Sequence, residues 1–270
     1  MKIAFIGGGN MATALIGGLL KKDWPAANIA VVEISADARE RLARELRVSA
    51  HAELAPALKD ASCIVFAVKP QQLKTVAAAA APLLGGAMVI CIAAGVRLET
   101  LSRWLGGYRR IVRAMPNTPA LVLAGVTGLY APADLTATDR AQAVNILGVA
   151  GATLWVDSEE RMDAITAISG SGPAYVFYFM EALQAAAVKL GFSEEDARFL
   201  ANETFSGAVQ LASQSEDPVA VLRTKVTSKG GTTERAIATM EAHAVKAHIG
   251  LGVEGAAVRS RELGDELGNS

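Results

Sequence analysis

The sequence contains little cysteine and little histidine. There are two cysteines and three histidines among 270 residues. Cys63 and Cys91 each stand in a short apolar run that predicts a buried strand, so we expect core thiols rather than a disulfide or a catalytic thiol. His51, His243 and His248 do not have the spacing of metal ligands. The cysteine and histidine content therefore argues against a disulfide-stabilised protein and against a metal site.

The chain also lacks an excess of charge and a long hydrophobic segment. The 26 basic and 27 acidic residues give a formal net charge of -1, so no overall field favours nucleic acid or an anionic membrane. The apolar run at residues 1–6 is too short for a signal peptide, and the run from Pro173 to Leu190 is interrupted by Glu181 and Lys189. We therefore expect a cytoplasmic protein that binds neither nucleic acid nor membrane and whose ligand is a small molecule.

Short β-branched runs alternate with longer alanine- and leucine-rich segments up to about Trp155. Such alternation is typical of βαβ units, and strands that are apolar throughout are typical of a parallel sheet with helices on both faces. We expect strands near residues 2–6, 29–33, 63–68, 88–93, 110–114, 125–130 and 152–156, with helices near 11–21, 36–45, 71–84, 98–105 and from 139. Two prolines predict a loop at residues 115–119. The expected fold of residues 1–157 is α/β, with a doubly wound, mostly parallel sheet.

After Asp157 the apolar residues recur with a period of 3.6. The periodic segments cover residues 159–190, 194–213, 218–224 and 232–263, which predicts an all-helical domain over residues 158–270. Ser193 and Asp196 form a predicted N-terminal capping pair, and Gly191 is a predicted C-terminal stop for the preceding helix. We expect only about the last seven residues to be frayed.

A glycine-rich turn directly follows the first predicted strand. In Gly7-Gly8-Gly9-Asn10-Met11-Ala12, Gly7 would form the tight turn, Gly9 would let the backbone approach a pyrophosphate, and Ala12 would allow close helix packing. The phosphates would lie at the N-terminus of the next helix, where free N–H groups favour anions. Glu33 ends the second strand, where an acid can bind ribose hydroxyls. The pattern predicts a dinucleotide site, and the alternative is a glycine turn that serves packing alone.

Four further segments are candidates for ligand contacts. Residues 67–70 and 93–95 close two parallel strands at the edge where open α/β sheets bind ligands. Lys69 is either a cofactor contact or a solvated surface charge. Residues 169–173 and 226–233 are hydroxyl-rich turns before apolar helices, and each could cradle a carboxylate or simply cap its helix. Two such turns beside a nucleotide-binding domain favour a small carboxylate substrate.

Taken in order, these motifs resemble pyrroline-5-carboxylate reductase. The resemblance runs from residue 1 to about residue 263 and rests on the motifs at residues 7–11, 67–70, 113–119, 169–175 and 226–233. It implies an oxidoreductase that reduces Δ1-pyrroline-5-carboxylate to L-proline by hydride transfer from NAD(P)H, the last step of proline biosynthesis. It also implies a Rossmann-type domain followed by a helical dimerisation domain, with a homodimer or a larger homo-oligomer formed through the helical half.

The resemblance also assigns roles to particular positions. Ser228, Thr232 and Thr233 would hold the substrate carboxylate, with Glu159 and Thr166 on the other side of the imine ring. Thr166 is the candidate catalytic residue, as a donor to the ring nitrogen or as the group that positions a water. A protonated imine is already a good hydride acceptor, so the site needs no His or Lys acid. The implied cofactor contacts are Ile6, Gly7, Gly8, Gly9, Asn10, Met11, Ala67, Val68, Lys69, Pro70, Ala93, Ala94, Gly95, Met115, Pro116 and Asn117.

The residues after the second strand bear on cofactor preference. Glu33 can bind the ribose hydroxyls of NADH and would repel the 2′-phosphate of NADPH, whereas Ser35 and Arg39 follow closely enough to contact that phosphate. We expect both cofactors to be accepted, NADPH to be somewhat favoured in line with the family, and Glu33 to turn outward.

The chain departs from the family pattern at three positions, and two other functions fit the outline. His51, Lys225 and Lys229 stand where relatives commonly have Asn, Asn and Pro, which affects cofactor affinity more than chemistry. A β-hydroxyacid dehydrogenase-like reductase would need a catalytic lysine, and Lys189 lies too far along its helix. A non-catalytic dinucleotide sensor would bind NADPH but oxidise none in the presence of the imine.

Overall fold

The computed structural model describes residues 1–269. The chain divides into two compact units. The first contains Met1–Ser171 and the chain from Gly255 onward, and the second contains Gly172–Glu254. The chain therefore returns to the first unit at Gly255, which a division at one position in the sequence cannot describe. The division between residues 157 and 158 stays a prediction.

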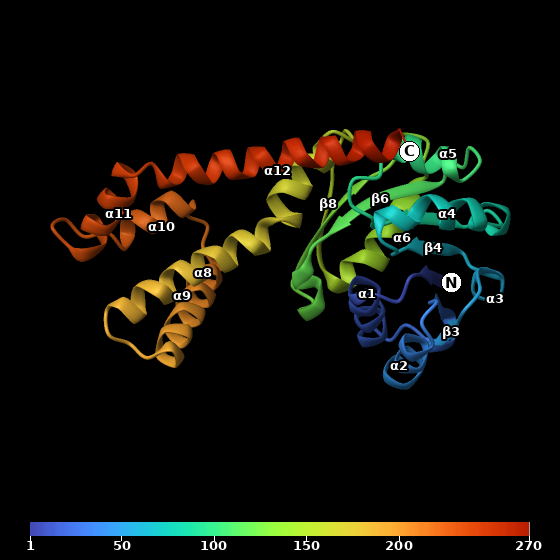
Figure 1. Ribbon diagram of the computed structural model, residues 1–270, viewed down its shortest axis with the longest axis horizontal. Coiled ribbons are helices and arrows are strands. Elements are labelled where there is room, and N and C mark those ends of the chain that lie inside the picture. Colours follow the sequence, from blue (N-terminus) through green and yellow to red (C-terminus); the bar gives the residue numbers. More distant parts are fainter. Residues whose placement is uncertain (270) are drawn as a thin grey trace. The chain divides into compact units, whose positions relative to one another are not determined.

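The first unit is built on a sheet of eight strands, most of them parallel (Figure 1). Only the β6–β7 pair is antiparallel among the strand pairs of the described residues. In spatial order the strands are β3 (Ser49–His51), β2 (Ile29–Val32), β1 (Ile3–Ile6), β4 (Cys63–Phe66), β5 (Met88–Cys91), β6 (Ile111–Pro116), β7 (Gly125–Tyr130) and β8 (Gly151–Trp155). The predicted doubly wound, mostly parallel sheet is confirmed.

Helices cover both faces of this sheet, which explains the continuous apolar runs. On β1, the side chains of Ile3 and Phe5 belong to one core cluster and those of Ala4 and Ile6 to the other. The first cluster is completed by α1 (Asn10–Lys21), α2 (Ala36–Leu46) and α6 (Ala137–Leu147), and the second by α3 (Leu54–Leu58), α4 (Pro70–Ala80) and α5 (Leu98–Trp104). A strand between two such layers buries both of its faces, so the pattern of alternating polar residues is absent.

The prediction of a loop at residues 115–119 is wrong in part. Met115 and Pro116 are the last residues of β6, and a 3-10 helix follows at Thr118–Val122. Pro116 is tolerated because it ends its strand, and Pro119 lies in the first turn of the short helix, where a backbone N–H would have no helical partner. The sequence also did not reveal β3 and α3, which are too short to show a period.

Helices make up the second unit, and its capping pair is as predicted. The unit contains α8 (Gly172–Lys189), α9 (Glu194–Gln214), α10 (Val219–Lys225), α11 (Thr232–Ala242) and the start of α12 (Val245–Gly268). Asp196 N donates to Ser193 Oγ at 3.0 Å, and Ser193 Oγ donates to the Asp196 carboxylate at 2.7 Å. Among residues 1–269, no helix has the length and apolarity to cross a membrane.

Two predicted long helices are interrupted. The segment at 159–190 consists of α7 (Arg161–Ile165), a π-helical turn at Thr166–Gly170, and α8. The segment at 232–263 breaks between α11 and α12, where Ala244 has a φ of 53°. Neither break was predicted, because the apolar residues on the two sides of each break still read as one periodic segment in the sequence.

The expectation of a frayed C-terminus is wrong for the residues that the structure describes. Helix α12 continues to Gly268, and Arg103 Nη2 donates to Gly268 O at 2.5 Å. Arg97 pairs with Asp265 at 2.8 Å, and a Cβ added to Gly95 would lie 3.3 Å from Leu263. These contacts with residues 95–103 hold the end of the helix within the first unit. Ser270 lies outside the described residues.

Both cysteines are core residues, as predicted. Cys63 and Cys91 are unpaired and buried. Burial raises the pKa of Cys91 to about 11 and raises the pKa of Cys63 further above its ordinary value. Both thiols are therefore protonated near neutral pH. Nucleophilic chemistry needs the thiolate, so neither cysteine is suited to it.

Candidate functional site

A cavity of about 700 Å³ opens at the carboxyl ends of β1 and β4 in the first unit. These adjacent strands lie where the strand order reverses, which is the position at which open α/β sheets bind their ligands. Eight of the predicted cofactor contacts line the cavity, namely Ile6, Gly7, Gly8, Gly9, Glu33, Ala67, Val68 and Lys69. The structure therefore brings together residues from three separate predicted motifs.

The cavity has a second wall that the sequence did not single out. It is formed by Ile34, Ala52, Leu54, Gln71, Gln72, Thr75, Val76 and Ala79. Positions 72, 76 and 79 recur with the spacing of one helix face, so the signal was present in the pattern of α4. The sequence alone could not show that this face of α4 borders a cavity rather than solvent, because that depends on the topology of the sheet. Of the other predicted contacts, Asn10, Ser35 and Pro70 adjoin lining residues in the chain, whereas Met11, Arg39, 93–95 and 115–117 neither line this cavity nor adjoin a residue that does.

The glycine turn has the geometry that an anion site requires. Gly7 has a φ of 102°, and a Cβ at this position would lie 2.8 Å from the carbonyl oxygen of Ala67. Gly9 is the N-cap of α1, no side chain caps this helix, and its first turn has no acidic residue. The space around a Cβ at Gly9 is open. Free N–H groups at a helix N-terminus bind phosphate well, so these residues fit the pyrophosphate of a dinucleotide.

Glu33 does not turn outward as we expected. Its carboxylate accepts hydrogen bonds from the backbone N–H groups of Gly8 and Ser35, each at 3.0 Å. These two donors draw the side chain toward the glycine turn, because a carboxylate is stabilised by backbone N–H groups. Arg39 lies beside it, and its Nη1 donates to the carbonyl oxygens of Glu33 and Ile34 at 2.8 Å each. The side chain of Arg39 thus fixes the turn that carries Glu33.

The side chain of Asn117 is engaged with the protein itself. Its Nδ2 donates to Ser169 O at 3.1 Å, and its Oδ1 accepts from Val126 N at 2.8 Å. The residue is 9% exposed. Asn117 therefore connects the end of β6 to the π-helical turn.

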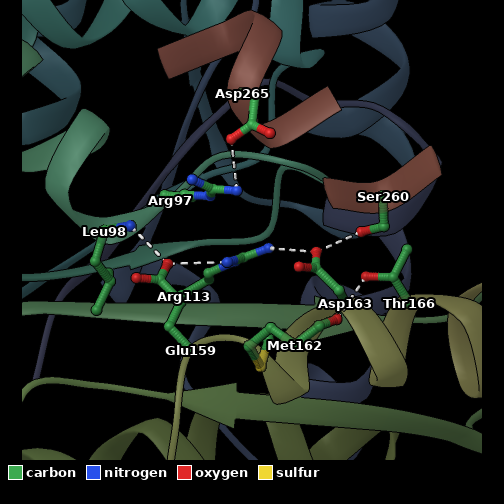
Figure 2. Close-up of polar contacts among 9 residues, drawn as sticks. All are labelled: Arg97, Leu98, Arg113, Glu159, Met162, Asp163, Thr166, Ser260 and Asp265. Carbon is green, nitrogen blue, oxygen red and sulfur yellow. Dashed lines mark hydrogen bonds and ion pairs between the residues drawn. The ribbon is translucent and has the colours of Figure 1, made fainter. Parts of the chain in front are cut away.

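Glu159 and Thr166 both belong to the first unit, Glu159 shortly before α7 and Thr166 directly after it (Figure 2). Glu159 Oε1 accepts from Leu98 N at 2.8 Å and from Arg113 Nη1 at 2.9 Å. Thr166 opens the π-helical turn, and its Oγ1 donates to Met162 O at 2.8 Å. The Thr166 oxygen keeps its acceptor capacity, whereas its proton must leave Met162 before it can be donated elsewhere.

Ser228, Thr232 and Thr233 belong to the second unit, at the N-terminus of α11. Gly231 is the N-cap, and no side chain caps the helix. In the described part of the chain the three hydroxyl groups have no hydrogen-bond partner. Glu234 accepts from Gly230 N at 2.7 Å, so one backbone donor of this turn is already used. The remaining hydroxyl and N–H groups form a cradle suited to a carboxylate.

Comparison with protein-family models matches both parts of the chain. Residues 159–263 match the model described as pyrroline-5-carboxylate reductase dimerisation. Residues 2–95 match the model described as NADP oxidoreductase coenzyme F420-dependent. The second match covers the glycine turn, Glu33 and the strand ends that line the cavity.

Relatives and solved structures match over nearly the full length. A pyrroline-5-carboxylate reductase of Pseudomonas aeruginosa is 45% identical, covering 99% of this chain and 98% of the relative. A structure of a pyrroline-5-carboxylate reductase from Coxiella burnetii is 39% identical, with a TM-score of 0.92 and coverage of 97% of this chain and 98% of the other. The Plasmodium falciparum enzyme, solved with NADP bound, is 30% identical with a TM-score of 0.87, covering 98% of each chain. By sequence and by fold, this chain belongs to the pyrroline-5-carboxylate reductase family.

Proposed function

We propose that this protein reduces Δ1-pyrroline-5-carboxylate to L-proline with NAD(P)H. The observation that carries the proposal is 45% identity with a reductase of that name over 99% of the chain. The cavity at the glycine turn supports it, because its residues fit a dinucleotide. The protein acts in the cytoplasm, where its two unpaired cysteines remain reduced.

An absorbance assay tests the proposal. Purified protein is expected to oxidise NADPH and NADH when pyrroline-5-carboxylate is present, and parallel reactions contain 2-oxo or 3-hydroxy acids with the matching cofactor form. Turnover of a hydroxy acid without turnover of the imine would identify a dehydrogenase instead. Binding of NADPH with no oxidation in the presence of any of these compounds would identify a dinucleotide sensor.

The residues of this chain bind and orient the reactants. When bound, the nicotinamide supplies a hydride to the imine carbon, so the chemistry belongs to the cofactor. The uncapped N–H groups of α1 would hold the pyrophosphate, and Ser228, Thr232 and Thr233 would hold the carboxylate of the substrate. Thr166 Oγ1 would face the ring nitrogen, as a hydrogen-bonding group or as the group that orients a water. Rate acceleration then comes mainly from holding the two reacting carbons close and in line.

Glu33 limits the use of NADPH in this proposal. Its carboxylate lies at the Gly8 N–H, where it can bind the ribose hydroxyls of NADH and repel the 2′-phosphate of NADPH. The Glu33→Gln substitution removes the charge and retains an oxygen that can accept from Gly8. We expect the ratio of kcat/KM for NADPH to that for NADH to rise about tenfold, which corresponds to about 1.4 kcal/mol. An unchanged ratio would contradict a role for Glu33 in cofactor choice.

Substitution of Arg39 gives a second test of cofactor choice at the same turn. Its Nη1 is used by two carbonyl oxygens, which leaves other N–H groups of the guanidinium for the 2′-phosphate. We expect Arg39→Ala to lower kcat/KM for NADPH more than for NADH. An equal loss with both cofactors would mean that Arg39 serves only to hold the turn.

We propose that the second unit forms a homodimer. Large apolar side chains remain exposed on α8 and α9, namely Val176, Phe177, Tyr178, Leu183, Val188, Phe199, Leu200, Val209 and Leu211. Exposed apolar side chains in this number on two helices favour an association surface. The match of residues 159–263 to a dimerisation model supports the same conclusion.

A charged residue on α8 is expected to weaken the dimer. Phe177 is 58% exposed, so Phe177→Asp should leave the isolated subunit folded while placing a charge where a partner's apolar surface would lie. Sedimentation at micromolar concentration is expected to show a monomer with little activity. The control is Lys189→Ala, in the last turn of α8, which should remain a fully active dimer. Loss of activity in this control would instead favour a dehydrogenase with a catalytic lysine.

A further inference from the structure

A group of charged side chains is enclosed where β6, α7 and the end of α12 meet (Figure 2). Arg113 on β6 is only 4% exposed. Its Nη1 lies 2.9 Å from Glu159 Oε1, and its Nη2 lies 3.9 Å from Asp163 Oδ1. A buried cation is stable only where anions compensate it. Arg113 therefore fixes the positions of two carboxylates, one before α7 and one within it.

Ser260 of α12 joins this group. Its Oγ donates to Asp163 Oδ1 at 2.6 Å, and the exposed fractions are 3% for Ser260 and 8% for Asp163. Hydrogen bonds to an ionised carboxylate are among the stronger ones. Arg97 and Asp265 form a second contact between α12 and an earlier segment of the first unit, at 2.8 Å. Helix α12 is thus anchored to α7 by a buried bond and to the segment before α5 by an exposed one.

The element that follows α7 directly is the turn that carries Thr166. Helix α7 ends at Ile165, and the π-helical turn occupies Thr166–Gly170. Asn117 holds the other end of this turn through Ser169 O, at 3.1 Å. A π-helical turn is rare in proteins and is found often at functional sites. With both ends held, the direction of the Thr166 side chain depends on where α7 is fixed.

We propose that Ser260, acting through Asp163, is a positioning residue for the reaction at Thr166. The C-terminal helix would fix α7, and α7 would aim the Thr166 hydroxyl at the substrate. The inference rests on the proposed function, because it assumes that Thr166 faces the imine. A purely structural bond between Ser260 and Asp163 would add to stability but leave the rate of the folded enzyme unchanged.

The test is the Ser260→Ala variant, which removes the bond with little risk to folding, since Arg113 still faces Asp163. We expect kcat with pyrroline-5-carboxylate to fall at least about tenfold, because small errors in position cost large factors in rate. The Kd for NADH, measured by fluorescence, should stay within about twofold of the parent value. Hydrogen exchange at residues 161–171 should become faster. Ser260→Cys, which retains a weak donor, should have a kcat between those of the parent and Ser260→Ala.

The matched control is Arg259→Ala, one residue away on the same helix. Arg259 is exposed and pairs only with Glu262 and Glu266 of α12 among the ion pairs of the described residues, so its loss should leave kcat unchanged. An unchanged kcat in Ser260→Ala, an equal loss in Arg259→Ala, or a loss explained by weaker NADH binding would each overturn the proposal. If the parent enzyme does not reduce the imine at all, the proposed function is wrong. If the parent is active and the Ser260→Ala variant is equally active, only the positioning role of Ser260 is wrong.

Discussion

Replacing Gly9 with alanine is expected to weaken NAD(P)H binding by at least about a hundredfold while leaving the fold intact. A Cβ at Gly9 meets no atom of the protein within 4 Å, and the residue has a φ of -73° that any amino acid can adopt. The added methyl group would instead occupy the space into which the pyrophosphate must come to reach the N–H groups of α1. Fluorescence titration with NADH and NADPH measures the effect, and thermal unfolding reports on the fold.

Substitutions of two other glycines serve as controls for Gly9→Ala. Gly17→Ala in the interior of α1 also meets no atom within 4 Å, and we expect it to bind cofactor normally and to gain about 0.5–1 kcal/mol of stability. Gly7→Ala should lower stability itself, because its Cβ would press on the backbone of Ala67 at 2.8 Å. If Gly9→Ala bound cofactor as tightly as the parent, the phosphates could not lie at the start of α1.

Replacing Thr233 with alanine is expected to reduce kcat/KM for pyrroline-5-carboxylate by about 10- to 150-fold. Thr233 lies in the first turn of α11, a helix that no side chain caps. A hydrogen bond to a charged group contributes about 1.5–3 kcal/mol, and each 1.4 kcal/mol corresponds to a factor of ten. The loss should appear chiefly in KM for the imine, because the carboxylate is bound in the ground state as well as in the transition state.

A threonine further along the same helix is the control. Thr239 donates to the carbonyl oxygen of Arg235 at 2.9 Å, so Thr239→Ala removes a hydroxyl from α11 without touching the proposed cradle. We expect its KM for the imine and its Kd for NADH to equal those of the parent. In Thr233→Ala, a Kd for NADH weakened to the same degree as KM for the imine would indicate general misfolding rather than loss of a substrate contact.

Several features could be predicted from short segments because local physics alone specifies them. The central strands β1, β2, β4 and β5 were visible because both of their faces are buried, which makes each run apolar throughout. The glycine turn was visible because only glycine tolerates the φ of Gly7 and the approach of Ala67. The cap at Ser193 was visible because its partner, Asp196, is only three residues away. In each case the residues that interact are neighbours in sequence or share one repeating pattern.

Other features depend on contacts between distant residues and could not be predicted. The orientation of Glu33 is set by the Gly8 N–H, 25 residues earlier. The fixed end of α12 depends on Arg97, Arg103 and Asp163, each far from it in the chain. No period or motif in the sequence encodes such pairings, because they arise only when the sheet brings the segments together.

The sequence by itself determined the class of fold, the glycine turn after the first strand and the family to which the chain belongs. These follow from apolar periodicity, from glycines with restricted backbone geometry, and from an ordered set of motifs. Only the tertiary structure decided that Glu33 faces the glycine turn, that Asn117 contacts the protein rather than standing free for a ligand, and that Ser260 holds Asp163. The physical reason is that a side chain's hydrogen-bond partner is chosen among all groups within reach after folding, and most of those groups are remote in sequence.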